Sequence, residues 1–169
     1  MSGGTAQANG RLWGARARDW AEVQEGQFAA AFHAVLAHAG VGHGTLHLDA
    51  GCGAGMAAAL SASLGARVAG IDAAEGMLEI ARERTPGGDF RQGDLEALPF
   101  DDNAFDLVTG FNAFQFASDP VKACWCGLAD TPKLTSVMSD IGVEGLDKTE
   151  GATPPSPFTA MPQITLRQM

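Results

Sequence analysis

The sequence predicts an α/β protein built on a parallel sheet, and three observations support this. The chain has 169 residues, 46% hydrophobic and 18% charged, which is enough to bury the core of one globular domain. Short apolar runs that suit buried strands alternate with segments of helical apolar spacing. Three of these runs end at an aspartate, as strands often do where a sheet binds a ligand.

The elements before residue 66 follow from this pattern. Apolar residues recur at helical spacing between Arg16 and Ala39, which predicts a helix there. Residues 46–48 form a short apolar run that stops at Asp49, and we interpret it as a buried strand. Helical spacing resumes from Met56 to Leu64, and Gly65 supplies a C-terminal stop.

The same alternation continues to residue 122. Residues 67–71 predict a second strand that closes on Asp72, residues 74–84 a second helix, residues 89–92 a third strand and residues 105–109 a fourth. Asp119 and Pro120 are typical of a helix N-cap followed by proline at the first helical position. We divide the chain into an N-terminal helical region (1–44), a partial α/β domain (45–126) and an irregular tail (127–169).

The tail differs from the rest in composition. Every lysine lies at or beyond Lys122, most prolines lie beyond it, and the apolar residues there show no sustained period. So abrupt a change suggests a truncated or frame-shifted end, a hypothesis that fails if the tail packs as ordered strands against the sheet.

Charge and composition argue against several classes of protein. The net charge of -9 disfavours a nucleic-acid partner, and no apolar run approaches the roughly 20 residues that a membrane span needs. Three cysteines make no disulfide framework, so a reducing cytoplasm is expected. The Cys124 and Cys126 pair and the four histidines lack metal-site spacing, so we predict no metal.

Three carboxylates, Asp49, Asp72 and Asp94, close three successive strands. Ligands of open parallel sheets bind outside the carboxyl ends of the strands, where the strand order reverses. If the first strand is central, these three acids gather at one rim of the sheet.

Asp49 stands directly before a glycine-rich turn that contains Gly51, Cys52, Gly53 and Gly55. The glycines allow a tight turn and close approach of a ligand. Dinucleotide enzymes place a pyrophosphate at such a turn, which an adjacent carboxylate would repel. A phosphate-free cationic nucleoside such as S-adenosylmethionine, with its sulfonium and α-ammonium, suits the acid better.

The other two acids suit the rest of a nucleoside. Asp72 is placed to accept hydrogen bonds from ribose hydroxyls, a role that nicotinamide enzymes share. Asp94 is placed to accept from an adenine amino group while the N–H of Leu95 donates to a ring nitrogen, and Met77 would lie on the adenine face.

Four segments together resemble the class I S-adenosylmethionine-dependent methyltransferases of the type 11 group, which includes ubiquinone/menaquinone methyltransferases. They are residues 48–55, 71–77, 93–100 and 105–108, in the family's order and spacing. The resemblance covers roughly residues 45–122 and implies a Rossmann-like fold and S-adenosyl-L-methionine as cofactor. It implies cofactor contacts at Asp49, Gly51, Cys52, Gly53, Gly55, Asp72, Met77, Asp94, Leu95 and Phe111.

The resemblance also implies methyl transfer to a small-molecule acceptor, with catalysis by positioning and water exclusion. Asn112 and Gln115, which follow the fourth strand, are candidate acceptor-positioning residues, and we name no general base. The family sheet has the order 3-2-1-4-5-7-6, and this sequence supplies only the strands 3-2-1-4. The missing strands would leave an edge open to self-association. Two alternatives therefore stay open: a cofactor-binding remnant without catalysis, and an NAD(P)-binding oxidoreductase.

Overall fold

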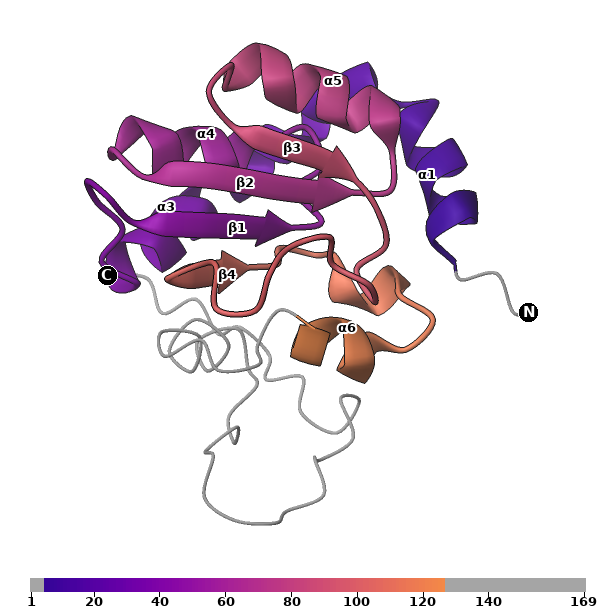
Figure 1. Ribbon diagram of the computed structural model, residues 1–169. Helices are drawn as coiled ribbons and strands as arrows, with labels where there is room; N and C mark the ends of the chain where they lie inside the picture. The colour runs from indigo at the N-terminus through magenta and orange to yellow at the C-terminus, as the bar shows by residue number, and fades with distance from the viewer. Residues whose placement is uncertain (1–4, 127–169) are drawn as a thin grey trace, which may run out of the picture.

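A computed structural model describes residues 5–126, which form a four-stranded parallel sheet flanked by helices (Figure 1). The strands are β1 (Leu46–Ala50), β2 (Arg67–Asp72), β3 (Asp89–Gln92) and β4 (Leu107–Thr109), in the spatial order β3-β2-β1-β4. All neighbouring strands are parallel, with Leu48 of β1 opposite Ala69 of β2 and Val108 of β4. The predicted sheet and its order are therefore confirmed.

The helices surround this sheet. The long ones are α1 (Ala6–Gly14), α3 (Ala29–His38), α4 (Met56–Ser63), α5 (Glu75–Arg84) and α6 (Pro120–Cys126). Between α1 and α3 lie α2 (Ala17–Asp19), the π-helical turn η1 (Trp20–Gln24) and the 3-10 turn η2 (Glu25–Phe28), and a further 3-10 turn, η3 (Phe114–Phe116), precedes α6.

The prediction of one continuous helix from Arg16 to Ala39 is wrong, because the segment is divided into α2, η1, η2 and α3. The π and 3-10 turns change the number of residues per turn, so the apolar faces before and after them do not line up. Phe32 and Leu36 are buried as the spacing predicted, whereas Phe28 is 40% exposed. The change of winding instead turns Glu25 into the interior, where it is 3% exposed.

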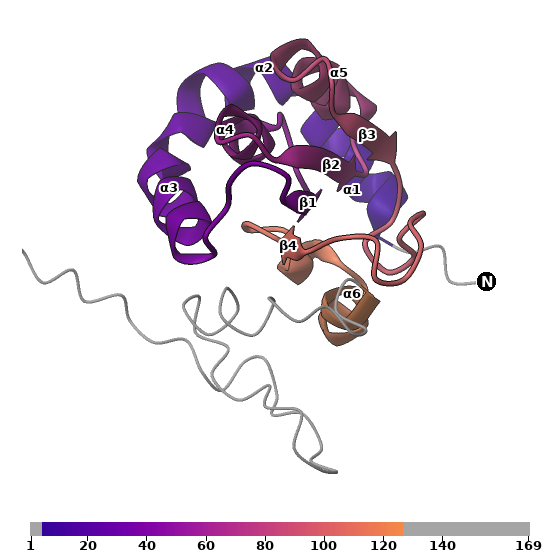
Figure 2. The same cartoon turned by 60° about the vertical axis from the view of Figure 1, so that its left-hand side comes forward.

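One face of the sheet packs against α4 and α5, whose small side chains allow close contact (Figure 2). Gly55 precedes α4 in the left-handed region, at φ +82°. A Cβ there would lie 2.7 Å from Cβ of Ala81 in α5, so only glycine fits. The buried residues of this layer are Cys52, Ala58, Val68, Leu78, Ala81 and Phe90.

The opposite face of the sheet packs against the segment between β3 and β4 and against η3. Leu48, Ala69, Ile71 and Val108 are buried there. The side chains that cover them are Leu95, Leu98, Phe100, Phe105 and Phe114. Within residues 5–126, β4 pairs with β1 alone, so its outer edge has no partner strand in the described part of the chain.

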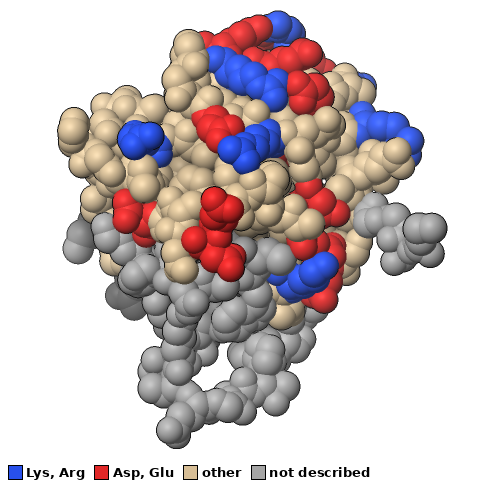
Figure 3. Space-filling view, viewed as in Figure 1, with Lys and Arg blue, Asp and Glu red and all other residues tan. Residues whose placement is uncertain are grey.

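Several smaller predictions concern the ends of elements and the surface. The backbone N–H of Lys122 donates to the carboxylate of Asp119 at 2.9 Å, which confirms the predicted N-cap of α6. The predicted irregular tail, residues 127–169, lies outside the described residues. Acidic and basic side chains are interspersed on the face shown in Figure 3. The described residues include exposed ion pairs such as Arg91–Asp89, at 2.6 Å. No helix in the described range has the length and apolarity to cross a bilayer.

Candidate functional site

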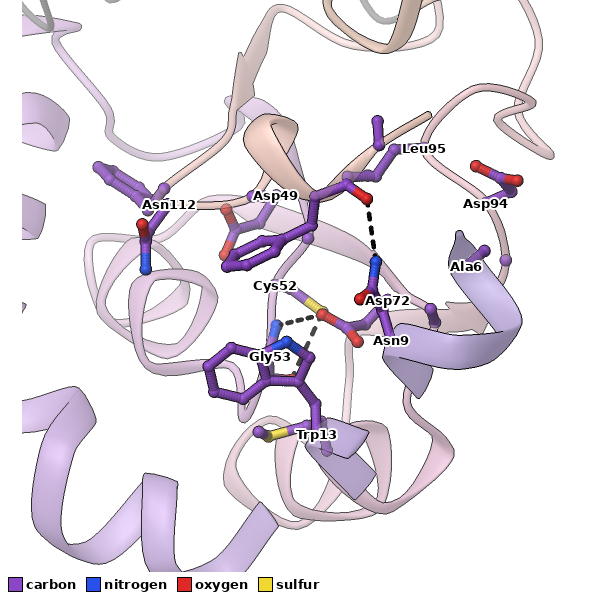
Figure 4. A pocket seen from close by; sticks show the side chains of 18 of the residues that line it. Ala6, Asn9, Trp13, Asp49, Cys52, Gly53, Asp72, Asp94, Leu95 and Asn112 are labelled. Carbon is purple, nitrogen blue, oxygen red and sulfur yellow. Dashed lines mark hydrogen bonds between the residues drawn. The ribbon is translucent and has the colours of Figure 1, made fainter. Parts of the chain in front are cut away.

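A pocket opens at the carboxyl ends of the strands, where the sheet order reverses between β1 and β4. Its lining comes from the glycine-rich turn after β1, the ends of β2 and β3, the segment after β4, and the N-terminal helices (Figure 4). Asp49, Cys52 and Asp72 converge in the middle of it. Parallel α/β sheets bind ligands at this position.

The glycine-rich turn has its shape because two of its residues adopt a positive φ, which glycine tolerates best. Gly51 has φ +76°, and a Cβ there would lie 2.3 Å from Cβ of Ala113, on the segment after β4. Gly53 has φ +52°, and a Cβ there would meet only the indole Nε1 of Trp20, at 3.8 Å. The backbone of Gly53 therefore faces open space, where a ligand can approach it closely.

Asp49 and Glu25 are both buried acids of the pocket lining, and Asp49 stands near the end of β1. Asp49 is 2% exposed, and its Oδ1 accepts a hydrogen bond of 2.8 Å from the hydroxyl of Thr109 on β4. Burial first, and the nearby carboxylates of Glu25 and Asp72 to a smaller extent, raise the pKa of Asp49 to about 7 against the lowering effect of the Thr109 hydroxyl. A positive charge placed in the pocket would favour the ionised carboxylate.

Asp72 links the glycine-rich turn to the start of the next helix. Its two oxygens accept hydrogen bonds of 2.9 Å from the backbone N–H groups of Gly53 and Ala74. Burial raises the pKa of this carboxyl, and those backbone donors counteract the rise. Each oxygen keeps a lone pair for a ligand hydroxyl, so Asp72 both shapes the turn and offers acceptors.

Glu25 is a third acid of the lining, and the sequence analysis missed it. It accepts a hydrogen bond of 3.2 Å from the N–H of Met56 at the start of α4 and forms an ion pair with Arg84 at the end of α5. Arg84 also donates to the carbonyls of Ala54, at 2.9 Å, and Ala21, at 3.2 Å. This ion pair therefore joins the N-terminal helices to the walls of the pocket.

The N-terminal helix α1 lies across one side of the pocket and is fastened to the segment after β4. The carbonyl of Phe116 accepts hydrogen bonds from Asn9, at 2.9 Å, and from the hydroxyl of Thr5, at 2.6 Å. The ring of Trp13 packs edge-on against Trp20 and Phe116, with centroids 5.2 and 5.8 Å away. Residues 1–44 were predicted as a helical region, but no helix was predicted before Arg16, so the position of α1 was not foreseen. All five of these residues line the pocket.

Nearly all of the predicted site residues meet in this pocket. Asp94 accepts a 2.9 Å hydrogen bond from the N–H of Glu96, which shapes the loop that carries Leu95. The predicted site residues that line the pocket are Asp49, Gly51, Cys52, Gly53, Asp72, Met77, Asp94, Leu95, Phe111 and Asn112.

Gly55 and Gln115 do not line the pocket. Gly55 serves the packing of α4 against α5, as its closeness to Ala81 shows. Gln115 is exposed, and its amide nitrogen donates to the side chain of Asn112, which itself adopts φ +52°. Gln115 therefore acts on the pocket only through Asn112.

The charged side chains that line the pocket are all acidic. Glu25, Asp49, Asp72 and Asp94 contribute carboxylates, and no described lining residue is lysine, arginine or histidine. Arg84 neutralises Glu25, which leaves Asp49 and Asp72 without a cationic partner in the hydrogen bonds and ion pairs found among residues 5–126. In the same range, no group of three or more His, Cys, Asp or Glu side chains could hold a metal ion. The pocket thus matches a cationic ligand and disfavours a phosphate group.

Known proteins match the same part of the chain. Residues 48–125 match the family model described as a methyltransferase domain. A demethylmenaquinone methyltransferase of Renibacterium salmoninarum is 40% identical over 76 residues, which is 45% of this chain and 32% of the relative. A malonyl-[acyl-carrier protein] O-methyltransferase of Serratia marcescens is 39% identical over 72 residues, which is 43% of this chain and 28% of the relative. This chain therefore matches about a third or less of these curated relatives.

A solved structure agrees in fold. It is the complex of the Haloferax volcanii Trm112 methyltransferase activator with a methyltransferase, which aligns with a TM-score of 0.58 at 33% identity. The alignment covers 66% of this chain and 51% of that one. The likeness supports the sheet order and the placement of helices described above.

Proposed function

We propose that this chain, which is similar through residues 48–125 to a methyltransferase domain, binds S-adenosylmethionine in the pocket and transfers its methyl group to a small-molecule acceptor. The observation that supports this most is a pair of carboxylates, the buried Asp49 and the partly buried Asp72, beside a glycine-rich turn in a pocket with no described basic residue. Buried acids need a positive partner, and a pyrophosphate would add negative charge.

Different residues of the pocket are proposed to contact different parts of the cofactor. We assign Asp49 to the sulfonium and the α-ammonium, Asp72 to the ribose hydroxyls, and Asp94 with the Leu95 N–H to the adenine edge. Met77, which is 2% exposed, would pack on the adenine face. The open space over the backbone of Gly53 leaves room for the ligand.

Bound S-adenosylmethionine supplies an activated methyl group on a sulfonium. The chain's own contribution is to orient the acceptor and exclude water around it. Trp13, Trp20, Phe32, Phe111 and Phe116 give the lining an apolar, aromatic rim. Asn112 lines the pocket on the segment after β4, and we propose that it positions the acceptor, with Gln115 holding its side chain.

The acceptor is proposed from the same lining. Aromatic side chains and the absence of any described cation favour a flat apolar group over one that carries a free carboxylate at the reacting end. The names of the two relatives indicate different acceptors, demethylmenaquinone for one and a malonyl group on acyl-carrier protein for the other. A cytoplasmic location stays a prediction from cysteine usage.

Isothermal titration of the purified chain with S-adenosylmethionine, S-adenosylhomocysteine and NAD tests the proposal. We expect the first two to bind and NAD to give no heat. Binding of NAD alone would overturn the proposal and favour the oxidoreductase alternative. Transfer of a labelled methyl group to demethylmenaquinone analogues then tests catalysis. Tight binding with no transfer to any acceptor would support the alternative of cofactor binding without catalysis.

A further inference from the structure

Asp49 is the end of a buried chain of four polar side chains. The Nδ1 of His47 lies 2.8 Å from the hydroxyl of Ser61 in α4, and its Nε2 lies 2.8 Å from the hydroxyl of Thr109 in β4. The same Thr109 hydroxyl donates to Oδ1 of Asp49 at 2.8 Å. The four residues are 0% to 2% exposed, and only Asp49 lines the pocket.

When Asp49 is ionised, the hydrogen-bond chain has one consistent direction. Thr109 has a single hydroxyl proton and gives it to the carboxylate, so its oxygen must accept from His47. His47 is therefore protonated on Nε2 and accepts the Ser61 proton on Nδ1. Burial lowers the pKa of His47 to about 4, which agrees with a neutral ring in this arrangement.

We propose that His47 and Thr109 are positioning residues that hold Asp49 as an oriented, ionised acceptor for the α-ammonium group at the amino-acid end of the cofactor. The inference rests on the proposed function, because it concerns the ligand assigned there to Asp49. It assigns a role in ligand affinity to a histidine and a threonine that do not line the pocket. The Thr109 hydroxyl donates the one side-chain hydrogen bond that lowers the pKa of Asp49, so losing it would raise that pKa and favour the protonated carboxyl.

Other charged groups near Asp49 act in the opposite direction. Glu25 on η2 and Asp72 on β2 both raise the pKa of Asp49. Arg84 on α5 is paired with Glu25. Cys52 in the glycine-rich turn stays a neutral thiol, because burial and the nearby acids raise its pKa. The polar chain through Thr109 is thus the stabilising contact of the Asp49 carboxylate within the described residues.

The test compares two ligands that differ only in the part that Asp49 is proposed to hold. S-adenosylhomocysteine carries the amino-acid end, and 5′-methylthioadenosine lacks it. For Thr109→Val, which removes the hydroxyl, we expect the dissociation constant of S-adenosylhomocysteine at pH 7 to rise at least about tenfold. That of 5′-methylthioadenosine should change less than about twofold, and Thr109→Ser, which keeps the hydroxyl, should bind both ligands nearly as the original chain does.

The pH profile gives a second readout. Because the pKa of Asp49 is about 7, affinity for S-adenosylhomocysteine should increase from pH 5.5 to 7.5, and Thr109→Val should move this increase to higher pH. Ser61→Ala, at the far end of the chain, should shift the profile in the same direction by a smaller amount, and it serves if Thr109→Val does not fold.

Each other outcome counts against the inference. Unchanged affinity for S-adenosylhomocysteine in Thr109→Val and Ser61→Ala would overturn it. An equal loss for both ligands would show that Thr109 only maintains the pocket. If the original chain binds neither ligand, the proposed function itself fails, and the inference falls with it.

Discussion

Glu25 and Arg84 form an ion pair that connects elements far apart in the sequence, so its removal should destabilise the whole fold. The side chain of Glu25 is 4% exposed and that of Arg84 is 27% exposed. We consider Glu25→Gln, which keeps the shape of the side chain and the acceptor oxygen for the N–H of Met56. What it removes is the negative charge opposite Arg84.

The size of the effect follows from burial. Breaking a buried ion pair by removing one partner costs about 3 to 5 kcal/mol, because the other charge is left unpaired. Arg84 reaches solvent in part and keeps its bonds to the carbonyls of Ala54 and Ala21, so we take a lower value of about 2 to 3 kcal/mol. For a chain of this size that corresponds to a fall in Tm of roughly 4 to 12 °C.

Thermal and urea unfolding, followed by circular dichroism, measures this change. Glu75→Gln is a matched control, because Glu75 pairs with Arg82 at 2.6 Å while the two side chains are 47% and 41% exposed. An exposed pair contributes about 0 to 1 kcal/mol, so the control should unfold almost as the original chain does. Equal losses in the two variants, or none in Glu25→Gln, would refute the idea that this ion pair holds the N-terminal helices on the domain.

Two further substitutions test the packing around the pocket. Gly55→Ala should lower the free energy of unfolding by about 3 kcal/mol, because of left-handed backbone strain and contact with Ala81. Gly44→Ala is the control, because Gly44 has φ +84° but a Cβ there would meet nothing within 4 Å, and it should lower the free energy of unfolding by only about 1 kcal/mol. Urea titrations measure both. Asn9→Ala removes the hydrogen bond to the carbonyl of Phe116 and should weaken S-adenosylhomocysteine binding about fivefold in calorimetry, while Ala at the exposed Gln7 should not. Equal affinity in the two α1 variants would mean that α1 does not secure the pocket.

The sequence predicted those features of the fold that depend on local patterns. Strands β1, β2 and β3 and helices α4 and α5 were found within two residues of their ends, because apolar periodicity and glycine stops are local signals. The glycine-rich turn and Asp49 were placed correctly in the pocket for the same reason. Gly55 was assigned to the ligand by its motif, but its role in packing depends on Ala81, which a motif does not reveal.

What the sequence did not predict depends on contacts between distant residues. Glu25 looks like an ordinary exposed acid in a helical pattern until the π and 3-10 turns direct it toward Arg84, which lies 59 positions away. Helix α1 has a polar sequence with no buried residue, so no apolar stripe marks it, and its hydrogen bonds reach residues more than 100 positions away. His47 was placed on a strand, but its hydrogen-bond partners were not predicted, because Ser61 and Thr109 come near it only in the folded chain.

His47 and Asp49 should leave opposite marks on the pH dependence of stability. Their folded-state pKa values are about 4 and about 7, against ordinary values of 6.5 and 3.8. Between pH 4 and 6.5 the unfolded chain holds a proton on His47 that the folded chain lacks, so this residue makes stability rise with pH. Over nearly the same range the folded chain holds a proton on Asp49 that the unfolded chain lacks, so that residue makes stability fall with pH.

In the original chain the effects of His47 and Asp49 on the pH dependence of stability oppose each other. Removal of His47 should leave the effect of Asp49, which lowers stability as pH rises. In His47→Leu, the free energy of unfolding should fall relative to the original chain as pH rises from 4.5 to 6.5, by at most about 1.4 kcal/mol for each pH unit. Taking the difference between the two chains cancels the groups that they share, among them Asp72. Urea titrations at pH 4.5, 5.5 and 6.5 measure it, and parallel curves would mean that His47 does not lose its proton on folding.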